Sequence, residues 1–279
     1  MSESLIALVT ALADDELILG HRHSEWTGFA PHIEEDVAFA SIAQDEIGHA
    51  AALYSIVAEV TGHDPDRLAL GREPDEYRNA ILCERPNDDW AYTLARHWLY
   101  DTADAIRLDA LQDTKDERLG ALVNKMRREE RYHLIHADTW LKQIARGPVE
   151  GRTKLGQSMS DALPEAFGLF EPIENEDQAL AEGLMPTSSE ELSQRFADKV
   201  SSVFDEFGFS GHMIPQPGDR AEFVASSSGD LIAGEEGPGE EEPESDTALG
   251  GRRGKHSDEF KELWDIMTLT YRENPGTSW

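Results

Sequence analysis

Residues 44–50 read QDEIGHA and residues 128–134 read REERYHL, and each stretch contains the pattern Glu-x-x-His. The two pairs are Glu46 with His49 and Glu130 with His133. Side chains three residues apart project from one face of a helix, so each pair can offer a carboxylate oxygen and an imidazole nitrogen to one metal ion. A single such motif arises by chance in charged helices. Two of them, on separate helical segments, indicate a helical bundle with a two-metal site in its core.

The apolar residues around both motifs recur with helical spacing. Leu5, Leu8 and Leu12, for example, follow one another at intervals of three and four residues. Four long helices are predicted over residues 4–28, 32–60, 88–111 and 117–145, and weaker ones over 152–169, 188–206 and 258–271. Val37, Ile42, Leu53 and Val57 are expected on the inner side of the second helix, and Asn87 is expected to cap the third. No useful stretch alternates with the period of a strand, so we predict an all-α bundle of two helical hairpins.

Hairpin geometry predicts the remaining metal ligands. Residues equidistant from the turn of a helical hairpin lie at the same depth, so reflecting Glu46 through the first turn gives Glu16. Reflecting Glu130 through the second turn gives Asp101. The halves also repeat, because Glu16 and Asp101 are 85 residues apart and each Glu-x-x-His residue is 84 residues from its counterpart. The predicted ligands are Glu16, Glu46, His49, Asp101, Glu130 and His133. Carboxylates and imidazoles of this kind suit iron or manganese.

Several neighbouring residues have simpler explanations. Glu16 follows two aspartates, so a solvated acid is the alternative at that position. Asp45 and Glu129 adjoin the motifs without standing three residues before a histidine, and we expect Asp45 to be an exposed neighbour or a partner of a ligand. Glu25 lies too near the turn to meet Glu46, which favours a structural or partner-contacting role. Surface or packing roles are expected for His21, His23, His97 and His136, and core or interface positions for Trp26, Trp90, Trp98 and Trp140.

The charge of the chain excludes several classes of partner. Its 279 residues include 25 basic and 56 acidic ones, which gives a formal net charge of −31. A surface this acidic repels nucleic-acid phosphates and anionic membranes, so we expect neither as a partner. A salt-rich cytoplasm would screen the charge, which favours a halophilic source over a mesophilic protein with an acidic tail. Cys83 is the single cysteine, and the first residues lack the basic region of a signal peptide, so we expect a cytoplasmic protein.

Composition divides the chain into three parts. Residues 226–254 contain hardly any apolar side chains and cannot form a core, so we expect disorder there. The predicted organisation is a helical domain with trailing helices over 1–215, an acidic disordered linker over 216–256, and a C-terminal helix in 257–279. That last helix is amphipathic and is expected to pack on the bundle or on a partner.

Over nearly its whole length the chain resembles the ferritin-like subunits of phenylacetyl-CoA epoxidase. Four stretches carry the resemblance: DDELILGHRHSEWTGFAP at 14–31, IAQDEIGHA at 42–50, REERYHLIHADTWL at 128–141 and GGRRGKHSDEF at 250–260. The last stretch and the terminal Trp279 look most like the C-type subunit. The resemblance therefore implies a ferritin-like four-helix bundle with additional C-terminal helices.

The resemblance also implies a multicomponent enzyme that inserts one oxygen atom of dioxygen into the ring of phenylacetyl-CoA. In that family the di-iron centre lies in an A-type subunit, which pairs with a C-type one that is regarded as a structural partner with a decayed metal site. A separate E-type reductase supplies electrons from NADPH through FAD and an iron–sulfur cluster, and B-type and D-type proteins complete the system. No nucleotide fingerprint or cysteine cluster occurs in the present chain.

The six predicted ligands depart from the C-type expectation, because a decayed site should have lost some of them. Either this chain still binds metal, or the six side chains persist as a hydrogen-bonded network. The functional alternatives are a supporting subunit, a catalytically competent di-iron subunit and a scaffold without metal. An iron store or a manganese catalase is disfavoured by the helices after residue 150 and by the C-terminal segment.

Overall fold

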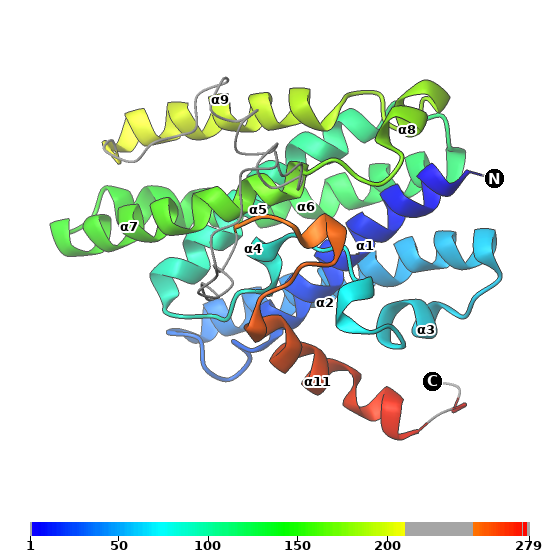
Figure 1. Cartoon of the computed structure of the whole chain (residues 1–279). Helices are drawn as coiled ribbons and strands as arrows, with labels where there is room; N and C mark the ends of the chain where they lie inside the picture. The colour runs from blue at the N-terminus through cyan, green and yellow to red at the C-terminus, as the bar shows by residue number, and fades with distance from the viewer. Residues whose placement is uncertain (1, 210–247, 275, 278–279) are drawn as a thin grey trace, which may run out of the picture.

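The computed structural model describes residues 2–209, 248–274 and 276–277, and four long helices dominate it. These are α1 (Glu3–Ser24), α2 (Ile33–Thr61), α5 (Trp90–Leu111) and α6 (Glu117–Ala145). Helices α1 and α2 form one hairpin, α5 and α6 form the other, and contacts between α2 and α6 join the two hairpins (Figure 1). The described ranges contain no strand, and the predicted all-α bundle is confirmed.

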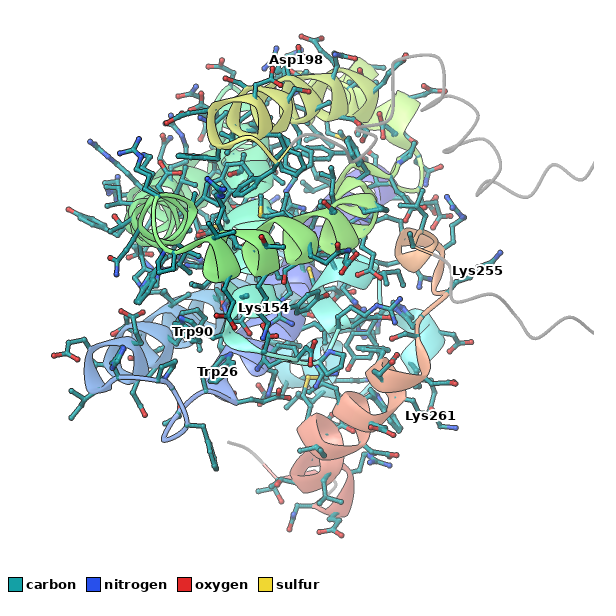
Figure 2. The ribbon with its side chains drawn as sticks, turned by 90° about the vertical axis from the view of Figure 1, so that its left-hand side faces the viewer. Trp26, Trp90, Lys154, Asp198, Lys255 and Lys261 are labelled. Carbon is teal, nitrogen blue, oxygen red and sulfur yellow. The ribbon has the colours of Figure 1, made fainter. Side chains whose placement is uncertain are left out.

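Further helices flank this bundle. Helix α7 (Val149–Ala166) packs along α5, and α9 (Ser189–Phe207) also contacts α5. Helix α11 (Asp258–Glu273) lies on the other side of the molecule from α9 in both views (Figures 1 and 2). Between α7 and α9 lie η2 (Phe167–Phe170) and α8 (Glu176–Glu182). Across the described residues, no helix is both long and apolar enough to cross a membrane.

The core follows the predicted apolar spacing, with one exception on α2. The leucines of α1 and the predicted Ile42, Leu53 and Val57 of α2 are buried. Val37, also predicted to face inward, is 64% exposed. None of the residues in the first turns of α2 before Phe39 is buried. Side chains two residues apart on a helix point in different directions, so Val37 faces outward there while Phe39 is fully buried.

The connection between the two hairpins holds short helices that the sequence pattern did not predict. They are α3 (Pro65–Leu70), η1 (Pro74–Glu76) and α4 (Ile81–Glu84). Asn87 was predicted to cap the third long helix, but Asp89 caps it by accepting hydrogen bonds from the backbone of Ala91 and Tyr92. The Asn87 amide instead donates to the Arg22 carbonyl at 2.6 Å. Asn87 therefore connects α1 to the start of α5.

The C-terminal part of the chain is fastened to the bundle from residue 248 onward. Residues 248–256 were expected to be disordered linker, but they include η3 (Gly251–Arg253), and Arg252 is buried among α1 and its neighbours. The remainder of the predicted linker, residues 216–247, and Trp279 lie outside the described residues.

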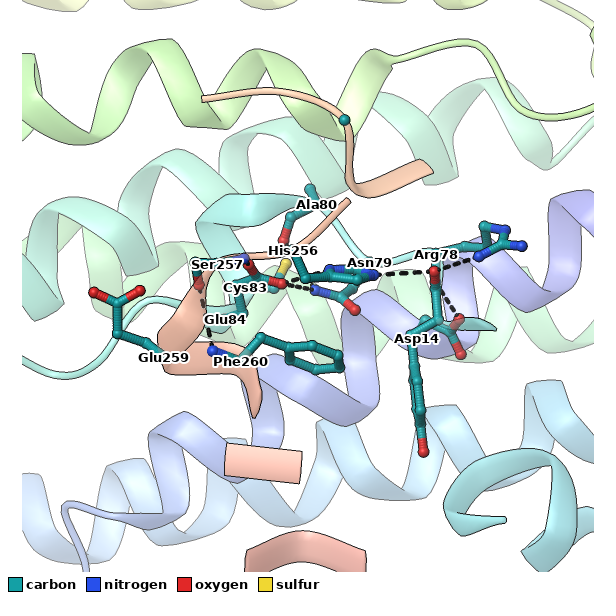
Figure 3. Close-up of polar contacts among 12 residues, drawn as sticks. Asp14, Arg78, Asn79, Ala80, Cys83, Glu84, His256, Ser257, Glu259 and Phe260 are labelled. Carbon is teal, nitrogen blue, oxygen red and sulfur yellow. Dashed lines mark hydrogen bonds and ion pairs between the residues drawn. The ribbon is translucent and has the colours of Figure 1, made fainter. Parts of the chain in front are cut away.

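A buried acid of α4 holds the start of α11. Figure 3 shows Glu84 beside His256 and Ser257, with Nδ1 of His256 at 2.7 Å and the Ser257 backbone N–H donating at 2.6 Å. The side chain of Asn79 donates to the same carboxylate at 2.9 Å. The C-terminal segment is therefore an integral part of the fold.

Close packing of α1 on α2 depends on Gly20. A Cβ atom at Gly20 would lie 2.9 Å from Cγ1 of Ile47 and 3.3 Å from the Ala43 carbonyl oxygen. A Cβ atom at the helical Gly48 would meet nothing within 4 Å. The first glycine thus permits the approach of the two helices, and the second has no such role within the chain.

Substituting each glycine by alanine separates packing from helix propensity. We expect Gly20→Ala to be less stable than Gly48→Ala by about 1–3 kcal/mol, because both gain the same helix propensity and only the first is overpacked. Chemical denaturation of the two variants and the parent measures this difference. Equal stability of the two variants would show that α1 and α2 are not in close contact at Gly20.

Candidate metal centre

All six predicted ligand residues lie in the core of the bundle, and none is more than 4% exposed. Glu16 comes from α1, Glu46 and His49 from α2, Asp101 from α5, and Glu130 and His133 from α6. The alternative that Glu16 is a solvated acid is therefore excluded. Four carboxylates thus occupy one buried region, where water cannot screen their mutual repulsion.

Three of the six converge on one point. One ligand atom from each of Glu16, His49 and Glu130 lies within 4.8 Å of the other two, and no other trio of histidine, cysteine or acidic side chains does so among the described residues. His49 Nδ1 is 3.2 Å from Oε2 of Glu16 and 3.2 Å from Oε1 of Glu130. The hydroxyl of Tyr100 donates to the other oxygen of Glu16 at 3.0 Å, which fixes the orientation of that carboxylate.

Glu46 is turned toward a different partner. Both of its oxygens lie close to Nδ1 of His23, at 3.0 and 2.9 Å. His23 is fully buried on α1, and its ring packs edge-on against Phe39 with the centroids 5.2 Å apart. Glu46 and His23 therefore form a buried pair within the core.

Asp101 has a similar neighbour on its own helix. Nδ1 of His97 lies 3.2 Å from Oδ2 of Asp101, although the geometry leaves both oxygens of Asp101 without a hydrogen bond. The other nitrogen of His97 is 3.2 Å from Nδ1 of His136, which in turn contacts Glu35 at 2.8 Å through its Nε2. A continuous row of polar side chains thus leads from Asp101 to the N-terminal part of α2.

The second Glu-x-x-His pair is joined to the surface by acidic neighbours. His133 lies between Oε2 of Glu130 at 3.2 Å and Oδ2 of Asp45 at 3.3 Å. His49 makes the matching contact on α2, with its Nε2 2.8 Å from Glu129. Asp45 and Glu129 are thus partners of ligand candidates and orient the two imidazoles.

Protons balance part of the negative charge. Burial raises the pKa values of Glu16, Glu46 and Asp101. Burial also opposes charge on His49, but the carboxylates of Glu130 and Glu16 outweigh it and raise the pKa of His49 to about 12. Burial likewise opposes charge on His133, and the carboxylate of Glu130 raises the pKa of that histidine to about 11. A metal ion bound by these residues would therefore displace protons from the imidazoles.

An arginine network lies next to Glu16. Asp15 is buried and accepts hydrogen bonds from Arg107 at 2.6 Å and from Arg252 at 2.7 and 2.9 Å. Burial alone would raise the pKa of Asp15, but the two guanidinium groups lower it. Arg252 belongs to the C-terminal segment, so that segment holds α1 in place one residue from a ligand candidate.

Aromatic rings close the bundle end near His23 and His97. Trp26 and Trp90 meet edge-to-face with their centroids 5.0 Å apart. Figure 2 labels both of them near the end where the α1–α2 turn lies. Phe39 packs against Trp90 and against both histidine rings. The two histidines are therefore held in fixed positions by packed rings.

Comparison with known families identifies the chain. A family described as "Phenylacetic acid catabolic protein" matches residues 1–221. The chain belongs to this family. It is 28% identical over 276 residues to the C-type subunit of 1,2-phenylacetyl-CoA epoxidase from Escherichia coli (strain K12), with 99% of both chains covered. It is 22% identical over 219 residues to the A-type subunit of the same enzyme from the same organism, which covers 77% of this chain and 70% of the relative.

The ligand prediction omitted two buried histidines of this chain, His23 and His97. Both are buried, in agreement with the packing role expected for them, but each also contacts a carboxylate of the predicted ligand set. Helical spacing contains the signal, because His23 follows Glu16 by seven residues and His97 precedes Asp101 by four. Glu25 has the structural role expected, pairing with Arg22 at 2.8 Å.

The described residues of this family member fit one metal ion. Oε1 of Glu130 is buried without a hydrogen bond, and a bound cation satisfies such an acceptor. Both oxygens of Asp101 are buried without one as well, but Asp101 does not belong to the converging trio. Glu16, His49 and Glu130 together supply carboxylate oxygens and one imidazole nitrogen from three different helices. Within the same described ranges, Glu46, Asp101 and His133 do not assemble into a second group of this kind.

Metal addition is expected to stabilise the protein through this trio. Anaerobic ferrous iron at about 100 times its Kd should add about 2.7 kcal/mol to the free energy of unfolding, because the ion binds the folded state. Glu16→Gln should abolish the gain, and Glu25→Gln, which alters a partly exposed carboxylate outside the centre, should retain it. Thermal unfolding with and without iron measures both. A gain that survives in Glu16→Gln would place the ion elsewhere.

Proposed function

We propose that this chain is the C-type subunit of a 1,2-phenylacetyl-CoA epoxidase and that it supports an A-type catalytic partner. The end-to-end match to the C-type relative carries the proposal, since it covers 99% of both chains, whereas the match to the A-type relative covers 77% of this chain. The reaction of the complex would be insertion of one oxygen atom of dioxygen into the aromatic ring of the CoA thioester. B-type and D-type proteins and an E-type reductase with NADPH, FAD and an iron–sulfur cluster would complete it.

The buried centre favours a supporting role over a catalytic one. Only Glu16, His49 and Glu130 of the six predicted ligands converge, while Glu46 is engaged by His23. We propose iron as the metal for the centre, because its carboxylate-rich donor set with imidazole suits that ion. Such an ion joins α1, α2 and α6, so it would stabilise the bundle that faces the partner.

An exposed apolar patch on the first hairpin is suited to the A-type partner. Phe29 is 80% exposed, Ile33 76% and Val37 64%, and all three lie at the α1–α2 turn or in the first turns of α2. Exposed apolar side chains that lie together on an otherwise acidic surface usually mark a site of contact with another protein. The hairpin of a homologous helical subunit would cover this patch.

Reconstitution with the A-type subunit tests the function. We expect the two chains to co-purify when they are expressed together, and oxidation of phenylacetyl-CoA by the complete system to require this chain. An A-type subunit that is fully active and equally soluble without it would contradict the proposal.

A matched pair of variants tests the patch. Ile33→Asp should weaken co-purification with the A-type subunit at least tenfold, because a charge would be buried in an apolar contact. Ile266→Asp serves as the control, since Ile266 on α11 is also 76% exposed and lies outside the patch. Equal capture by both variants would show that the first hairpin does not contact the partner.

A further inference from the structure

The six predicted ligands are enough for two metal ions, but only three of them converge, and Glu46 contacts a histidine outside the set. We propose that this chain binds one metal ion at a first position, held by Glu16, His49 and Glu130. The second position is the one that the other predicted ligands, Glu46, Asp101 and His133, would form, and His23 closes it by holding Glu46. This inference does not depend on the epoxidase assignment, because no partner or substrate enters it.

The first position has the features of a site prepared for a cation. Its three ligand atoms lie within 4.8 Å of one another, on three helices, and are buried. Oε1 of Glu130 has no hydrogen bond, and Glu16 is oriented by the hydroxyl of Tyr100 at 3.0 Å. His49 Nδ1 lies 3.2 Å from Oε1 of Glu130 and balances part of its charge, and a cation among the three ligand atoms would give that oxygen a direct partner.

The second position lacks the carboxylate that would join two ions. A carboxylate that joins two ions through separate oxygens uses both of them, and both oxygens of Glu46 lie within 3.0 Å of His23 Nδ1. His23 lies two helical turns after Glu16 on α1. The same helix therefore supplies Glu16, a ligand of the first position, and His23, the side chain that contacts Glu46.

His23 has little freedom to release Glu46. It is fully buried, and its ring lies edge-on to Phe39 at 5.2 Å and to His97 at 5.4 Å. His97 stands in turn beside Asp101, the α5 residue that the second position would need. Both oxygens of Asp101 nevertheless lack a hydrogen bond, so the pair of His23 and Glu46 is what closes the second position.

Counting iron tests the proposal on the full-length chain. The purified chain is loaded anaerobically with excess ferrous iron, desalted, and analysed for iron and protein. We expect about one iron per chain in the parent, about two in His23→Ala, and none in the Glu16→Gln, Glu130→Gln double variant. His21→Ala removes a histidine from the same helix outside the cluster and should retain one.

Two further variants keep the test decisive. His23→Asn retains a side-chain donor toward Glu46 and should stay at one iron, and Glu46→Gln in the parent should also stay at one because Glu46 is not a ligand there. Circular dichroism verifies that each variant is folded. Two irons or none in the parent, loss of iron in Glu46→Gln, or a folded His23→Ala that still holds one would each overturn the proposal. Failure to assemble with an A-type partner would leave these counts unchanged.

Discussion

Four carboxylates, those of Glu16, Glu46, Asp101 and Glu130, are buried together in the core of the helical bundle. Each carboxylate leaves water on folding, and the cost of that transfer is offset only by nearby positive charge or hydrogen bonds. The bundle supplies histidines from α1, α2, α5 and α6 for this purpose, and Asp15 beside the cluster is paired with two arginines. Each of these buried acids therefore has a basic side chain beside it in the folded protein.

The same cost of burial explains why the C-terminal segment returns to the bundle. Arg252 inserts between α1 and its neighbours and donates hydrogen bonds to Asp15. The carboxylate of Glu84 contacts the His256 ring and accepts a hydrogen bond from the Ser257 backbone N–H. A buried acid without these partners would be left uncompensated. Residues far apart in the sequence are therefore joined at two buried acids, Asp15 of α1 and Glu84 of α4.

Much of this arrangement could be predicted from the sequence, because it follows from helical periodicity. Reflection through the hairpin turns placed Glu16 and Asp101 in the same buried region as the two Glu-x-x-His pairs, which depends only on helix rise and turn position. The pairing of Glu46 with His23 could not be predicted in this way, since it depends on which way each side chain turns within the core. Arg252 was missed for a related reason, because the composition around it indicates disorder and only the tertiary contact with Asp15 orders it.

A single ion at Glu16, His49 and Glu130, in a chain that keeps a supporting role, would have a distinctive metal environment. X-ray absorption spectroscopy of the iron-loaded full chain measures that environment. We expect a shell of nitrogen and oxygen ligands with no iron–iron scattering at about 3.5–4 Å, the separation typical of two-metal sites. A clear iron–iron contribution in the parent chain would contradict the single-ion assignment and restore a two-metal centre.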